Sequence, residues 1–106
     1  MKKIEKLPES FQRALWSYDL GKLDAQKDKI EIITQILNHG NPHDLKLLFE
    51  IYSEEEIKEI IENPRRGVWF EKVLNFWVTV FNLHIKKSIW QEAILRFPLR
   101  PFAENK

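Results

Sequence analysis

Cysteine is absent from this 106-residue sequence, which excludes disulfide frameworks, thiolate catalysis and cysteine metal sites. Glycine is scarce, and the three that occur are scattered and match neither Gly-rich pattern for cradling phosphates. No run of about twenty apolar residues is present, and the first ten residues, MKKIEKLPES, contain no continuous apolar region. The sequence therefore predicts neither a membrane-spanning helix nor a signal peptide, and we expect a cytoplasmic protein.

The remaining composition predicts a single globular domain over residues 1–106. Apolar residues make up 43% of the chain and charged residues 31%, as in folded proteins rather than disordered ones. Apolar residues recur at helical spacing and no two-residue alternation persists, so the fold class should be all-α. Residues 97–106 are expected to form an irregular tail, because Pro98 and Pro101 stand three apart.

Residues 68–81, VWFEKVLNFWVTVF, are the most apolar part of the chain. On a helix their polar members would share about a quarter of the circumference, at roughly 100° per residue. Such a helix must be enclosed on nearly all sides, by its own domain or by a partner. We therefore predict a compact bundle of five to six short helices around it. The expected core residues are Leu37, Phe49, Ile57, Ile61, Leu74 and Trp77.

Local signals set the expected helix boundaries. Asp24 is a plausible N-cap for a helix that runs to about Asn38, and Gly40 is its stop signal. Asn41-Pro42 should cap and begin the next helix. Ser53-Glu54-Glu55-Glu56 has the capping-box pattern of a further helix, which ends at Asn63-Pro64. A last helix is expected over about 86–96, with Ile89, Trp90 and Ala93 turned inward.

Catalytic and metal-binding patterns are sparse. His39, His43 and Asp44 fall within six residues, but they span the predicted helix break and do not share one helical face. Surface histidines in a turn explain them better. We predict no metal, no cofactor and no enzymatic activity.

Charge is divided unevenly along the chain. Residues 1–62 hold nine Lys/Arg and thirteen Asp/Glu, a net −4, whereas residues 63–106 hold eight and three, a net +5. Lys86, Lys87, Arg96 and Arg100 are the possible nucleic-acid-binding residues, because Arg and Lys beside exposed aromatic rings can bind single strands. Residues 54–62 carry five carboxylates and one ammonium, which would repel phosphates. A nucleic-acid-binding transcriptional regulator that uses the basic C-terminal half is therefore the alternative function, which we do not favour.

The Arg65–Arg66 pair is the most distinctive loop feature. It lies between the acidic segment 54–62 and the apolar segment 68–81, and adjacent guanidiniums suit carboxylate or phosphate contacts. With Trp69 it forms our candidate partner-binding site. The alternative is that both arginines pair with nearby carboxylates such as Glu59, Glu62 or Glu71.

Several motifs resemble an uncharacterised family of small prokaryotic proteins. They are Leu15-Trp16-Ser17-Tyr18-Asp19, the segment Ile33–Gly40, Tyr52-Ser53-Glu54-Glu55, and Pro64-Arg65-Arg66 followed by Leu74-Asn75-Phe76-Trp77. Members of that family tend to be encoded beside nucleotidyltransferase-type toxins of abortive-infection systems. The resemblance, over residues 7–83, implies an antitoxin or accessory component that binds a protein partner, and such a toxin is the candidate partner. A homodimer is also expected, since the apolar helix is hard to enclose within one small chain.

Overall fold

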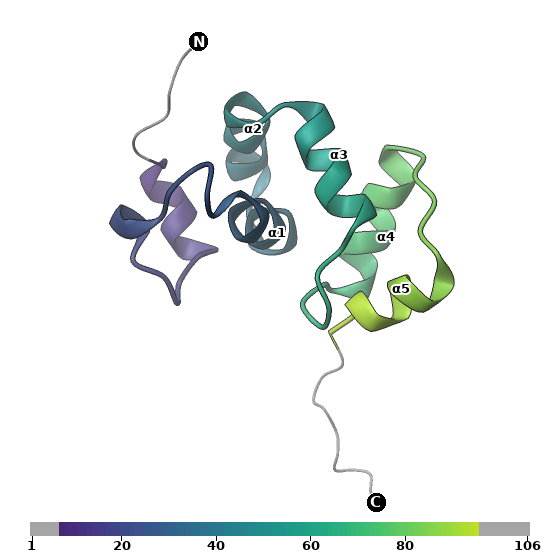
Figure 1. The fold of residues 1–106 in the computed structure, drawn as a ribbon. Helices are drawn as coiled ribbons and strands as arrows, with labels where there is room; N and C mark the ends of the chain where they lie inside the picture. Colours follow the sequence, from purple (N-terminus) through teal and green to yellow (C-terminus); the bar gives the residue numbers. More distant parts are fainter. Residues whose placement is uncertain (1–6, 96–106) are drawn as a thin grey trace, which may run out of the picture. The chain divides into compact units, whose positions relative to one another are not determined.

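The computed structural model describes residues 7–95. Their regular elements are helices, apart from one isolated β-bridge, which confirms the all-α class (Figure 1). The chain divides into two compact units, Met1–Ile61 and Glu62–Lys106, which we describe separately. The described elements are two 3₁₀ helices, η1 (Glu9–Arg13) and η2 (Leu20–Lys22), and five α helices, α1 (Lys29–His39), α2 (Pro42–Ile51), α3 (Glu54–Glu62), α4 (Glu71–Val80) and α5 (Lys87–Ala93). The single domain predicted for residues 1–106 stays a prediction, and its tail 97–106 lies outside the described residues.

The first unit has an aliphatic and aromatic interior. In it, α1 packs against α2, and the burial of apolar surface is the main force that holds such helices together. The most deeply buried apolar side chains are those of Phe11, Leu15, Ile32, Ile33, Ile36, Leu48, Tyr52, Ile57 and Ile61.

Of the six expected core residues, five are buried: Leu37, Ile57, Ile61, Leu74 and Trp77. Phe49 is only half-buried. It contributes less apolar contact than its place in the helical pattern suggests.

Two helix starts in the first unit agree with the local signals. Asn41 accepts from the Asp44 N–H at 2.8 Å while the Asp44 carboxylate accepts from the Asn41 N–H at 3.2 Å, and Pro42 is the first helical residue. Ser53 and Glu56 form the same reciprocal pair at 2.9 and 3.1 Å. These capping boxes satisfy N–H groups that have no partner within a helix.

The start of α1 differs from the expectation. Asp24 does accept from the N–H groups of Gln26 and Lys27, at 2.8 and 2.9 Å, but the regular helix begins only at Lys29. The reason is local competition, since the Asp28 carboxylate turns back to accept from the Asp24 N–H at 2.8 Å. Short acidic side chains that bond to nearby backbone favour turns over helix.

In the second unit α4 begins at Glu71, three residues later than residue 68, because residues before it pair with a distant segment. The chain itself does not enclose this helix on nearly all sides, and enclosure by a partner stays a prediction. Leu74 and Trp77 are buried, but Phe76 and Val80 are 56% and 52% exposed. A helix of ten residues buries the stripe that faces its neighbours, and apolar residues outside that stripe stay in solvent.

The last helix is shorter than expected and ends at Ala93. Ala93 is buried, as expected, and Trp90 is half-buried. The inward placement of Ile89 is wrong, since its side chain is 43% exposed. Within residues 7–95, no helix has both the length and the apolar character needed to cross a membrane.

Candidate functional site

The Arg65–Arg66 pair lies in the loop that joins α3 to α4. Pro64 is buried on one side of the pair, and both arginines are exposed. Gly67 follows with φ +72°, a left-handed conformation that side chains with a Cβ adopt only with strain. A Cβ at Gly67 would meet no atom within 4 Å, so the backbone angle, rather than crowding, accounts for the glycine.

Backbone hydrogen bonds tie this loop to the end of α5. The Gly67 N–H donates to the Glu92 carbonyl at 2.8 Å, and the Trp69 N–H donates to the Ala93 carbonyl at 2.9 Å. The Leu95 N–H in turn donates to the Trp69 carbonyl at 2.7 Å, which completes a parallel bridge between Trp69 and Ile94. Three bonds to one segment fix the position of the loop that carries the arginines.

Trp69 was grouped with the two arginines as a partner-binding residue, but in the structure its side chain lies in the interior. Its side chain is 0% exposed, so it offers no surface to a partner. It anchors the loop from the interior instead. Among the described residues its indole N–H has no hydrogen-bond partner.

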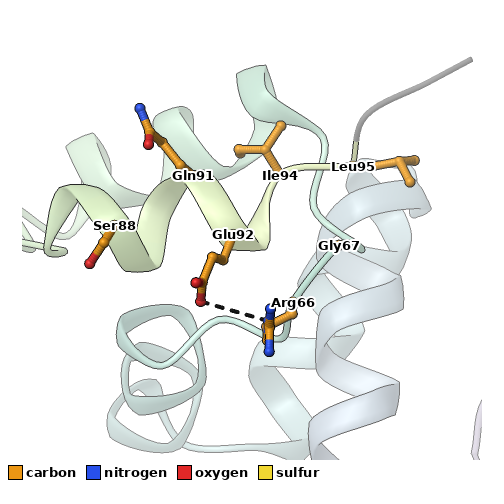
Figure 2. A pocket seen from close by; sticks show the side chains of 7 residues that line it. All are labelled: Arg66, Gly67, Ser88, Gln91, Glu92, Ile94 and Leu95. Atoms are coloured by element: carbon orange, nitrogen blue, oxygen red, sulfur yellow. Dashed lines mark ion pairs between the residues drawn. The ribbon is translucent and has the colours of Figure 1, made fainter. Parts of the chain in front are cut away.

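The ion pair that the structure shows for Arg66 is with Glu92, which was not among the carboxylates expected from the sequence. Nε of Arg66 lies 3.7 Å from Oε1 of Glu92, and the two side chains are 80% and 56% exposed. Figure 2 shows Glu92 reaching from α5 toward Arg66. A pair this long and this exposed contributes little stability, about 0–1 kcal/mol.

Arg66 and Gly67 form one side of an open depression of about 680 Å³. The other side is formed by α5 and the residues after it, with Ser88, Gln91, Glu92, Ile94 and Leu95 (Figure 2). A guanidinium, an amide, a hydroxyl and a carboxylate thus border one surface. Most of its exposed lining is nonetheless apolar, and its charged groups are Arg66 and Glu92.

The basic candidates for nucleic-acid binding are only partly described. Lys86 and Lys87 are exposed at the start of α5, whereas Arg96 and Arg100 lie outside the described residues. Lys87 and Trp90 border a second depression of about 350 Å³ together with Glu71, Gln91 and Ile94. The carboxylate of Glu71 there would oppose a phosphate.

His39, His43 and Asp44, which are close in the sequence, do not form a metal site in the described part of the chain. Asp44 is 0% exposed, and its Oδ2 accepts both from the Asn41 N–H and from Arg13, the latter at 3.1 Å. Partial burial lowers the pKa of the His39 imidazole below 6.5. In the part of the chain that is described, no three His, Cys, Asp or Glu side chains are placed to hold a metal ion together.

Two surface features were not identified from the sequence as candidate sites. Trp16, which follows η1, is 76% exposed, and Phe76 and Val80 form an exposed strip on α4. Helical spacing marks Phe76 and Val80 as neighbours, but spacing alone cannot tell an exposed stripe from a buried one.

The comparisons with known proteins concern the first unit. Residues 11–61 match the model of a family of unknown function, DUF6922. No curated protein and no solved structure matches the chain. The matched segment ends at residue 61, where the first unit ends, so it contains Trp16 but neither Arg65 nor Arg66.

Proposed function

We propose that this protein is a non-enzymatic antitoxin or accessory component of a toxin–antitoxin or abortive-infection system, and that it acts by binding a protein partner. The observation that carries the proposal is the Arg65–Arg66 loop, in which two exposed guanidiniums stand on a backbone tied to α5. Backbone hydrogen bonds already hold the loop in place, so less backbone entropy is lost when the arginines bind a partner.

The chemistry of the loop indicates an acidic partner surface. Guanidiniums form bidentate, charge-assisted hydrogen bonds with carboxylates, and arginine is common at interface hot spots. The exposed pair between Arg66 and Glu92, at 3.7 Å, is weak enough for a partner carboxylate to compete with it. The nucleotidyltransferase-type toxins suggested by the resemblance are the partners to test first.

Co-expression with the product of a neighbouring toxin gene tests this proposal. Wild-type protein should relieve growth arrest and co-purify with the toxin. The double change Arg65→Glu and Arg66→Glu should weaken binding by about 2–5 kcal/mol, since it places carboxylates against an acidic surface. Isothermal titration calorimetry would measure the loss.

A matched control separates the loop from net charge. Lys22→Glu with Lys46→Glu changes the charge by the same amount at two exposed lysines of the first unit. This control should bind and neutralise the toxin as the wild type does, and circular dichroism should show that both double variants stay helical. If the Arg65/Arg66 double variant neutralises the toxin as well as the wild type does, the loop is not the partner-binding site.

Nucleic-acid binding is the other outcome of the experiment. In that case the double change Lys86→Glu and Lys87→Glu should abolish binding to single-stranded DNA or RNA. The double change at Arg65 and Arg66 alone should not abolish it. Wild-type affinity should also fall steeply with added salt, because phosphate binding releases counterions. Toxin binding would then be unaffected by either double change.

A further inference from the structure

Trp16 is an exposed indole on a loop that is held in place. Its side chain is 76% exposed, the largest value among the exposed large apolar residues of residues 7–95. The Gln12 side-chain amide donates to the carbonyls of Leu15 and Tyr18, at 2.9 and 2.8 Å, on either side of Trp16. The Tyr18 hydroxyl donates to Glu31 of α1 and ties the loop to that helix. A rigid loop that displays a large aromatic ring is typical of an interface anchor.

The second unit carries its own exposed apolar strip. Phe76 and Val80 are one helical turn apart on α4, so they share a face, and each is more than half exposed. The Phe76 ring is braced edge-on by Trp77, with ring centroids 5.0 Å apart. Lys72, exposed and one turn before Phe76, continues the same strip with a positive charge.

The two units differ in the sign of their charge. Residues 7–61 hold six Lys/Arg and eleven Asp/Glu, a net −5, whereas residues 62–95 hold five and three, a net +2. An acidic unit around Trp16 disfavours anionic lipid and nucleic acid as its ligands, since both are repelled by carboxylates. It favours a basic protein surface with exposed apolar residues.

We propose that two copies of this chain associate, with the Trp16 loop of each copy docked on the Phe76–Val80 strip of the other. A second copy offers both an apolar strip and a unit whose net charge is opposite to that of the unit that carries Trp16. Each copy carries both surfaces, so a two-fold dimer would form this contact twice. The proposal is independent of the antitoxin function, and its test needs only the purified chain.

Sedimentation velocity on the full chain tests the dimer. The wild type should dimerise, and added salt should raise its dissociation constant because opposite charges are screened. Trp16→Asp and Phe76→Lys should each raise that constant at least tenfold. Ile89→Asp, a control at another exposed apolar position of the second unit, should dimerise like the wild type.

Mixing the two variants identifies which surfaces meet. A dimer of Trp16→Asp with Phe76→Lys has one contact intact and an Asp opposite a Lys in the other, so the unlike chains should associate although each variant alone is monomeric. Circular dichroism should show wild-type helix in both, because both side chains are exposed. A wild type that stays monomeric up to millimolar concentration, variants that still dimerise alone, or unlike variants that do not associate would each overturn the proposal.

Discussion

Replacing Trp69 by alanine should destabilise the protein by about 3–5 kcal/mol, the usual range for a fully buried large aromatic residue. Its side chain is 0% exposed. A buried tryptophan removes about 150–250 Å² from water, worth roughly 4–6 kcal/mol at 25 cal/mol per Å² as an upper bound. Small domains are stable by about 5–15 kcal/mol, so the change should remove a large share of the total.

Trp69→Phe should be far milder, within about 1 kcal/mol of wild type. The smaller ring loses some apolar contact, but the change also removes a buried indole N–H that has no partner among the described residues. Leaving such a donor unpaired costs about 1–3 kcal/mol, which offsets the lost contact. Trp16→Ala is the matched control at protein concentrations where the chain is monomeric, because a residue 76% exposed should change stability there by no more than about 0.5 kcal/mol.

Urea unfolding followed by far-ultraviolet circular dichroism measures all three changes. The expected order of midpoints places Trp69→Ala well below Trp69→Phe, with Trp16→Ala at the wild-type value. Trp69→Ala with an unchanged midpoint, or Trp16→Ala with an equal loss, would refute the assignment of Trp69 as the interior anchor of the loop.

Three further substitutions test local structure. Gly40→Ala should cost about 1–3 kcal/mol in thermal unfolding, because the added Cβ would lie 2.7 Å from the Ile36 carbonyl oxygen, although a φ of −75° suits alanine. Ser53→Ala should cost about 1 kcal/mol in urea unfolding, since it removes one side of the capping box with Glu56. His39 has a pKa lowered by burial, so the unfolded chain takes up a proton first and stability should fall as pH drops through 6.5. Urea midpoints from pH 7.5 to about pH 5 should therefore fall less steeply for His39→Gln than for wild type.

Local capping is where sequence and structure agree best. Asn41 with Asp44, and Ser53 with Glu56, are three residues apart, and each pair forms the predicted reciprocal hydrogen bonds. A cap depends on a few neighbouring residues, so its signal is complete within the sequence window that contains it. The all-α class follows for a similar reason, because helical spacing is also a local property.

Tertiary structure decided which aromatic residues are buried and which are exposed. Trp16 and Trp69 are the same residue type, yet one is 76% exposed and the other 0%. The exposed Phe76 and buried Trp77 are adjacent on one helix. Each outcome depends on which segments lie nearby, and apolar composition alone does not specify neighbours.

The candidate site shows the same division. The sequence by itself determined that two guanidiniums stand side by side after a helix-ending proline, and that a glycine follows them. Only the tertiary structure decided that Gly67 and Trp69 bond to residues 92–95, which starts α4 later and turns Trp69 inward. The pair between Arg13 and Asp44, 31 residues apart, arose in the same way. Backbone pairing and ion pairing across such distances require the chain to be folded first, and for that physical reason spacing along the sequence did not reveal them.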